Sequence, residues 1–388
     1  MTSTPTVFAK GFRPFFLLAA AFAVAFLPLW LLAYTGHVDA SAYWTPSTWH
    51  GHEMVFGFTV AVVAGFLLTA VGNWTKQETA VGGRLVVLCL LWLAGRLAVV
   101  FAGDLQPGLV VMADLLFIPA LAGAIGRPLI RTNNRRNLKF LGILALLWGA
   151  NAAMHLDALG VVEGWARPAL LLAVDLIAVI TLIIGGRIIP MFTRNAVGDA
   201  LIRSNKKLEK FLVVAVGAAI ALSVFAPMEW FTGAAAIIAG VAILARQTHW
   251  GAKQTIDKPI LWVLHLGHAW IAAGFVLRGL AVFTPQVSGS MGTHALTVGA
   301  IGLLTLGMMA RVALGHTGRE LKVTKPVAWA FVAMSLAALG RTLVPIIWPS
   351  HYVDWVIASG VLFALAFAVY LLQYVPILVK PRADGRPG

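Results

Sequence analysis

The chain has 388 residues, of which 60% are hydrophobic and 11% are charged, with a mean hydropathy of +0.87. Soluble domains average about 45–50% apolar and about 25% charged residues, so this composition excludes a water-soluble globule, a disordered chain and a disulfide scaffold. The net charge of +14 would suit a nucleic-acid binder, but basic residues also accumulate in the cytoplasmic loops of membrane proteins. We therefore expect a polytopic protein in a lipid bilayer, with no nucleic-acid partner.

Apolar stretches alternate with turn and charge clusters along the whole chain. A helix needs about 20 apolar residues to cross a hydrocarbon core roughly 30 Å thick. The stretches predict an all-α bundle of twelve membrane helices at residues 14–34, 48–72, 83–101, 108–126, 138–156, 168–189, 211–226, 229–245, 259–283, 293–314, 326–347 and 353–378. The first stretch is longer than a signal-peptide core of about 7–15 residues, so we expect a retained helix. The predicted organisation is one integral membrane domain over residues 1–388.

The connections between these helices differ sharply in charge. Both termini and the connections after even-numbered helices carry clusters of Lys and Arg, whereas the connections after odd-numbered helices carry only Arg167. Positive charge marks cytoplasmic loops. The pattern therefore predicts that both termini are cytoplasmic, which requires an even number of helices.

A weak internal repeat divides the chain into thirds. Similar dipeptides close the second, sixth and tenth predicted helices: Trp74-Thr75, Phe192-Thr193 and His316-Thr317. His52 and His294 each precede their threonine by 23 residues. The spacing predicts three units of four helices at about 1–126, 127–246 and 247–388, with chance similarity in a biased composition as the alternative.

Ionisable residues inside the predicted helices gather near the extracytoplasmic ends. By helical rise, five of them share a similar depth: Arg96, Arg278, Arg341, Asp114 and Asp175. Such residues are costly in a membrane and tend to face a bundle interior or a cofactor. Structural Arg/Asp pairs and snorkelling arginines are one explanation, and a ligand with negative charge, such as a haem with its propionates, is the other.

The motif Trp49-His50-Gly51-His52-Glu53-Met54 lies at the outer start of the second helix. Imidazole ligates iron and copper, and a Met thioether adds a soft ligand for Cu(I). On a continuous helix His50 and His52 would point about 200° apart, so we expect them to have different partners. His294 begins the tenth helix at nearly the depth of His52, and the two could be axial ligands of one haem.

A second histidine pair, His265 and His268, lies in the ninth helix with i, i+3 spacing, which places both rings on one face. The pair is either a metal site or a buried hydrogen-bonded pair. Small residues at Gly57, Ala61 and Gly65 favour close helix packing or the approach of a flat macrocycle. The sequence contains no phosphate-binding loop, zinc-type cysteine pair or nucleophile elbow, which argues against hydrolytic chemistry.

Four segments strongly resemble the NnrS family: KGFRPFFLLA (10–19), WHGHEMVFGF (49–58), GGRIIPMFTRN (185–195) and HALTVGAIGLLTLGMMARVALGHTGRE (294–320). With the twelve-helix layout, the resemblance covers nearly the whole chain. It implies a bacterial inner-membrane protein that contains haem b and copper, is produced in response to nitric oxide, and is associated with denitrification and nitrosative stress.

The resemblance brings no settled ligand list, so we assign ligands from motif membership and depth. In this hypothesis His52 and His294 ligate the haem iron, and Arg96, Arg278 and Arg341 are candidates for the propionates. Copper takes some of the following residues: His50, Met54, His265 and His268.

The layout is also similar to the main subunit of haem-copper oxidases, which has three arcs of four helices and histidine haem ligands on its second and tenth helices. The absence of histidine from the sixth and seventh predicted helices argues against oxidase activity. Enzymatic turnover and the electron donor stay open. The alternative function is a transporter or a metal or haem delivery protein with a polar site on the extracytoplasmic side, for which Pro28, Pro119, Pro190 and Pro345 could break the helices.

Overall fold

A computed structural model describes residues 5–39, 43–198, 202–203 and 205–386. Within these residues the chain is helical without strands, and twelve helical segments are long and apolar enough to cross a membrane. The polytopic all-α fold is thereby confirmed, and the apolar surface of these helices fits a lipid bilayer.

The first six membrane-length segments are built from eight α-helices and one π-helix. Their bounds are α1 Phe12–Tyr34, α2 Pro46–His52, the π-helix η2 Glu53–Thr59, α3 Val60–Thr75, α4 Gly83–Val100, α5 Pro107–Leu115, α6 Phe117–Arg131, α7 Lys139–Ala158 and α8 Ala166–Val197. Thr45 caps α2 with its hydroxyl, and Pro46 occupies the first helical position, where its missing N–H has no cost.

The last six segments contain a second π-helix. Their bounds are α9 Lys206–Phe225, α10 Trp230–Gln247, α11 Pro259–Phe283, α12 Gly289–His294, the π-helix η4 Ala295–Gly302, α13 Leu303–His316, α14 Lys325–Thr342, α15 Val344–Ile347 and α16 Tyr352–Leu378. Short 3-10 helices occur at Thr6–Phe8, Ala252–Thr255 and Pro349–His351.

Several helix ends differ from the sequence prediction. Helix α8 continues to Val197, eight residues beyond the predicted end, because Arg194 and Asn195 prolong the helix instead of starting a loop. Pro28 and Pro190 lie inside continuous helices, whereas breaks at Leu116 and Leu343 precede Pro119 and Pro345. The proline residues therefore give mixed support to the broken helices that a transporter would use.

The chain divides into two compact units, and three helices, α8, α13 and α16, contribute residues to both. Unit 1 contains residues Met1–Leu176, Met309–Leu321 and Phe367–Gly388, and unit 2 contains Ile177–Met308 and Lys322–Ala366. The predicted single domain with three repeats stays a prediction.

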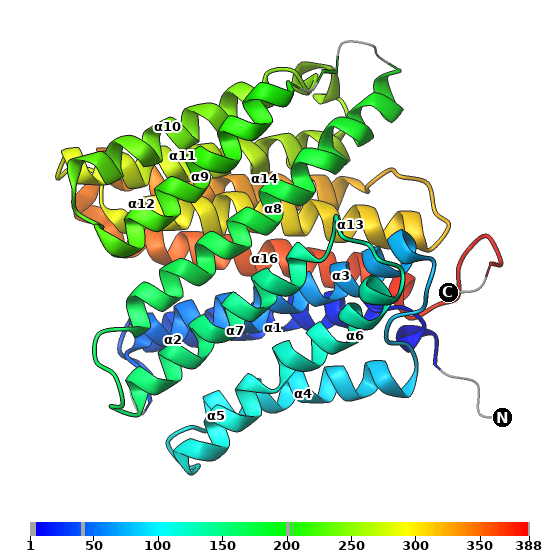
Figure 1. The fold of residues 1–388 in the computed structure, drawn as a ribbon, viewed down its shortest axis with the longest axis horizontal. Helices are drawn as coiled ribbons and strands as arrows, with labels where there is room; N and C mark the ends of the chain where they lie inside the picture. The colour runs from blue at the N-terminus through cyan, green and yellow to red at the C-terminus, as the bar shows by residue number, and fades with distance from the viewer. Residues whose placement is uncertain (1–4, 40–42, 199–201, 204, 387–388) are drawn as a thin grey trace. The chain divides into compact units, whose positions relative to one another are not determined.

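In unit 1, α1 packs against α3 and η2, α3 packs against α6, and α4 packs against α5 (Figure 1). Glycine makes the α1–α3 contact close, since a Cβ at Gly65 would lie 2.9 Å from ring atoms of Phe16. Arg13 is fully buried in this unit and donates from Nη1 to the carbonyl oxygens of Leu378, at 2.7 Å, and Lys380, at 2.9 Å. The KGFRPFF motif thus fixes the C-terminal end of α16.

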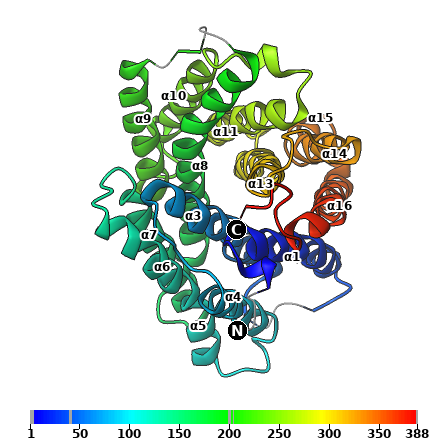
Figure 2. The same ribbon diagram turned by 90° about the vertical axis from the view of Figure 1, so that its right-hand side faces the viewer.

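In unit 2, α10 contacts both α9 and α11 (Figure 2), and α11 packs along α12 and η4. The α10–α11 contact again depends on glycine, because a Cβ at Gly240 would lie 2.7 Å from the carbonyl oxygen of Ala272. A Cβ at Gly299 in η4 would lie 2.6 Å from ring atoms of Trp270. These small residues therefore serve helix packing.

Candidate functional site

Both π-helices begin directly after a histidine that the sequence singles out. His52 ends α2 before η2, and His294 ends α12 before η4. A π-helix shifts the hydrogen-bonding pattern, and in η2 side chains bind the backbone: Trp92 Nε1 donates to the Gly57 carbonyl at 2.9 Å, and Thr59 donates to the Met54 carbonyl at 2.7 Å. Such segments are rare in proteins, and those that occur often lie at functional sites.

Unit 1 holds a buried cluster of charged and polar side chains, which we call the His52 cluster. It consists of His52, Glu53, Arg96, Asp114, Asn151 and His155, each at most 5% exposed. Arg96 forms ion pairs with Glu53 through Nη1 and with Asp114 through Nη2. The structural Arg/Asp pair that the sequence allowed is therefore present at Arg96 and Asp114.

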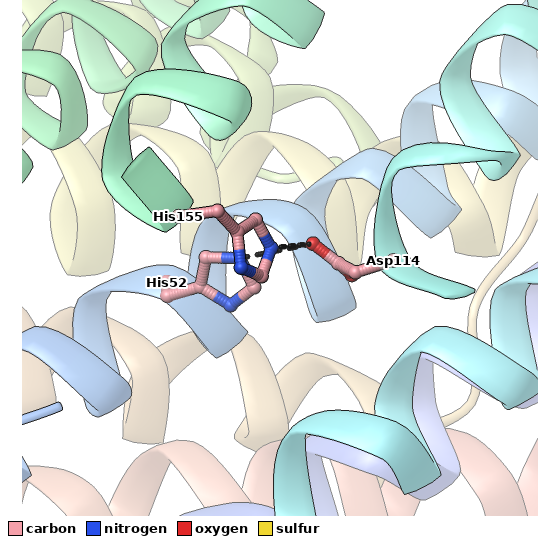
Figure 3. Close-up of side chains that lie close together, drawn as sticks. All are labelled: His52, Asp114 and His155. Atoms are coloured by element: carbon pink, nitrogen blue, oxygen red, sulfur yellow. Dashed lines mark hydrogen bonds and ion pairs between the residues drawn. The ribbon is translucent and has the colours of Figure 1, made fainter. Parts of the chain in front are cut away.

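Three members of the cluster point toward one another from α2, α5 and α7 (Figure 3). Asp114 Oδ2 lies 3.2 Å from Nε2 of His52 and 3.0 Å from Nε2 of His155. One ligand atom from each of these three residues lies within 4.8 Å of the others. Asn151 adds its side-chain amide, with Nδ2 2.7 Å from Asp114 Oδ2 and Oδ1 2.8 Å from His52 Nε2.

The opposite nitrogen of each histidine also has an oxygen partner. His52 Nδ1 lies 2.9 Å from Glu53 Oε1, and His155 Nδ1 lies 2.9 Å from the hydroxyl of Tyr43. Burial and the negative charge of Asp114 raise the pKa of Tyr43 to about 12, so this hydroxyl stays neutral at physiological pH. The Trp44 ring covers both imidazoles, at 4.4 Å from His52 and 5.1 Å from His155 between ring centroids.

A small cavity adjoins the cluster. It has about 10 Å³ of room for the centre of a water-sized molecule, which is space for about one water. Its lining combines polar side chains of the cluster with apolar rings and aliphatic groups, and consists of Phe56, Trp92, Gly95, Arg96, Asp114, Phe117, Ile118 and Asn151.

Unit 2 holds the His265 and His268 pair, with both rings buried. Thr193 donates its hydroxyl proton to the Ile189 carbonyl at 2.9 Å, so its oxygen accepts from Nε2 of His265, also at 2.9 Å. Gln247 donates to the His265 carbonyl at 2.7 Å, and its Oε1 accepts from Nδ1 of His268 at 2.9 Å. These bonds leave lone pairs on His265 Nδ1 and His268 Nε2, which are buried and find no hydrogen-bond partner among the described residues.

His294, also in unit 2, has a similarly defined tautomer. Its Nδ1 donates to the Ser290 carbonyl at 2.8 Å, so Nε2 carries the lone pair. Arg341 approaches the same residue, since its Nη2 donates to the Ser290 hydroxyl at 3.2 Å, and its guanidinium lies 5.2 Å from the Tyr352 ring centroid. A histidine and an arginine that the sequence proposed for haem thus share one neighbour.

The remaining predicted residues occupy distinct surroundings. The His50 ring stacks on Trp30 at 3.9 Å, whereas the His52 ring lies against Trp44. Met54 lies half-buried in η2. Arg278 in α11 packs closely against Gly292, where a Cβ would lie 2.6 Å from Arg278 Cγ.

The axial pairing of His52 with His294 stays a prediction, because the two residues belong to different units. The sequence did not predict that His155, Asn151 and Tyr43 lie in the cluster around His52. The depth of His155 was the available signal.

The described residues thus form twelve membrane-length helices around a polar interior of buried histidines and carboxylates, which defines a polytopic membrane protein with ionisable groups inside its helices. The sequence matches the family model described as NnrS protein over residues 6–382, and the chain belongs to this family. A search of curated proteins found no match. Family membership supports a membrane protein associated with the nitric oxide response.

Proposed function

We propose that this protein binds haem b and copper in the bacterial inner membrane, with both termini in the cytoplasm, and acts in the relief of nitric oxide stress. The observation that carries the proposal is a set of three histidines, the buried His265 and His268 and the partly buried His294, whose tautomers are fixed by oxygen acceptors, so that each turns a lone pair away from its supporting hydrogen bond. Metal-binding histidines are oriented in this way in proteins generally.

Haem fits His294 better than it fits His52. The Ser290 carbonyl holds the His294 ring through Nδ1, so that Nε2 is the ring nitrogen with the lone pair that a haem iron would need. Arg341 beside Ser290 and Arg278 on α11 are the candidates for pairing with propionates. His52 is fully buried, with Nδ1 beside Glu53 and Nε2 beside Asn151, and we keep the partly buried His294 as the haem ligand in this proposal.

Copper fits the His265 and His268 pair. Both rings project from one helix at i, i+3, and their unpartnered nitrogens are buried, an arrangement that costs free energy unless an ion is bound there. Thr193 and Gln247 orient the two rings through the opposite nitrogens, His265 Nε2 and His268 Nδ1. His50 and Met54 remain further candidates for copper.

When bound, ferrous haem and Cu(I) would supply centres that bind nitric oxide. The chain's own contribution is to orient the ligand nitrogens, to neutralise propionates with arginine and to keep the site dry. Turnover and the electron donor are not part of the proposal.

The test is an absorption spectrum and a metal analysis of the detergent-purified protein. We expect a Soret band with stoichiometric haem, and copper that is lost in a His265→Ala, His268→Ala double variant. His294→Ala should lose or shift the haem bands, while His351→Ala, which alters an exposed histidine, should match the wild type. Unchanged spectra in His294→Ala would overturn the ligand assignment, and the absence of both iron and copper would overturn the function.

A further inference from the structure

We propose that His52, Asp114 and His155 bind one non-haem divalent metal ion, best matched by Fe(II), beside a cavity that admits one small ligand such as nitric oxide. This centre lies within unit 1 and is additional to the haem and copper of the proposed function. It rests on four features of the His52 cluster: the separations of the ligand atoms, the oxygen partners of the two histidines, the charge balance and the adjoining cavity.

Both imidazole nitrogens lie at a metal-site separation from the carboxylate oxygen, and the three ligand atoms lie within 4.8 Å of one another. Nitrogen and oxygen ligands sit about 2.0–2.2 Å from a transition metal, so neighbouring ligands at right angles lie about 3.0 Å apart and tetrahedral ones about 3.4 Å apart. Asp114 Oδ2 lies 3.2 Å from His52 Nε2 and 3.0 Å from His155 Nε2. All three atoms can therefore reach one ion with small adjustments of the side chains.

The Nδ1 atoms of both histidines have the oxygen partners that are typical of metal ligands. Ligating histidines donate their other ring N–H to an oxygen, which fixes the ring and the tautomer. Glu53 Oε1 does this for His52 and the Tyr43 hydroxyl does it for His155. Arg96 binds Asp114 Oδ1 and leaves Oδ2 directed at the two imidazoles.

The hydrogen-bond balance of His52 calls for positive charge on the ring or at Nε2. Its Nδ1 faces the Glu53 carboxylate, and its Nε2 faces oxygens of Asp114 and Asn151. A neutral imidazole has one proton and cannot donate to both sides. The second position needs either a further proton or a metal ion, and the two carboxylates of the cluster against the single guanidinium of Arg96 favour that positive charge.

The surroundings distinguish this centre from a haem site. His52 Nε2 is enclosed by Asp114 and Asn151, and the Trp44 ring lies on the imidazole, which leaves no flat space for a porphyrin at this nitrogen. Two imidazoles and one carboxylate without sulfur form the ligand set of non-haem Fe(II) sites with open positions.

The cavity supplies space for an additional ligand. It borders Asp114 and Asn151 and is otherwise lined mainly by apolar groups such as Phe56, Phe117 and Ile118. Its volume suits one water or one diatomic molecule. Ligands larger than this are excluded by the packing of α4 against α5, where a Cβ at Gly95 would already lie 2.9 Å from Asp114 Oδ1.

The experiment loads chelator-treated, detergent-solubilised protein with Fe(II) alone under anaerobic conditions. Bound iron is measured by metal analysis and haem is measured separately, so that non-haem iron is the difference. We expect one non-haem iron per chain in the wild type and in His351→Gln, which changes an exposed histidine outside the cluster. His155→Gln, which replaces a neutral imidazole with a neutral amide, should bind no non-haem iron. Glu53→Gln should weaken Fe(II) binding about 10–100-fold.

Nitric oxide added to the loaded protein is the second readout. It should give the high-spin EPR signal of a non-haem iron nitrosyl, which differs from the low-spin signal of a haem nitrosyl, and His155→Gln should lack this signal.

Failure of the wild type to bind Fe(II) beyond its haem, or equal binding by His155→Gln, overturns the inference. If His155→Gln does not elute as a folded protein, Tyr43→Phe takes its place, because it removes only the oxygen beside His155 Nδ1. We expect this variant to bind Fe(II) more weakly than the wild type, and equal binding overturns the inference. A protein with haem but no non-haem iron would refute this centre alone, whereas non-haem iron without haem would refute the proposed haem site alone.

Discussion

Replacing Arg96 with methionine tests how the two buried carboxylates of the His52 cluster are held. Arg96 is 5% exposed, and its partners Glu53 and Asp114 are 0% and 3% exposed. Removing one partner of a buried ion pair costs about 3–5 kcal/mol, because it leaves an uncompensated buried charge. Two carboxylates lose their partner here, so we expect Arg96→Met to fall at the upper end of that range, a large share of a total stability of about 5–15 kcal/mol.

The assay is reversible unfolding by SDS titration in mixed micelles, read as the free energy of unfolding. Arg96→Lys retains the charge but not the two-armed geometry, and should lose about 1.5–3 kcal/mol, the contribution of one hydrogen bond to a charged group. Arg167→Met at an exposed position is the matched control and should stay within about 0.5 kcal/mol of the wild type. The reasoning is refuted if Arg96→Met differs from this control by less than about 1 kcal/mol.

Three further predictions concern single residues of unit 1. The pKa of Tyr43 is raised to about 12, so the neutral phenol stabilises the fold below its unfolded pKa of about 10, and this contribution is lost as the pH rises through about 12. The difference between the ultraviolet titration curves of the wild type and Tyr43→Phe should have its midpoint near pH 12. A midpoint near pH 10, the unperturbed value of about 10, would contradict the prediction. Gly95→Ala places a Cβ 2.9 Å from Asp114 Oδ1 and should cost about 1–3 kcal/mol in the SDS titration, whereas Gly123→Ala, with open space around it, should not destabilise. Arg13→Met removes two hydrogen bonds to backbone carbonyls and should lower the free energy of unfolding by about 1.5–3 kcal/mol for each bond. Proteolysis after Leu378 should increase as well. Unchanged cleavage and stability would contradict this role of Arg13.

The twelve membrane helices were predictable because each is a long apolar run, which needs no knowledge of tertiary contacts. The end of α8 was not predictable, because Arg194 and Asn195 can either extend a helix beyond its apolar region or start a loop. The π-helices were not predicted either. They depend on tertiary partners such as the Trp92 side chain that binds the Gly57 carbonyl, and no local pattern reports such a contact.

The candidate site was predictable in depth but not in composition. Helical rise placed Arg96 and Asp114 at one level, and the structure pairs them. Which residues join them depends on the rotation of each helix about its axis, and the sequence does not fix that rotation. His155 and Asn151 join the cluster because α7 faces α5 and α2, and that contact cannot be inferred from depth alone.

The most direct measurement of the central claim is the absorption spectrum of the reduced, detergent-purified protein together with its iron and copper content. The account predicts a Soret band with haem b and bound copper in amounts comparable to the protein. A spectrum without a Soret band, in protein that holds neither iron nor copper, would contradict it.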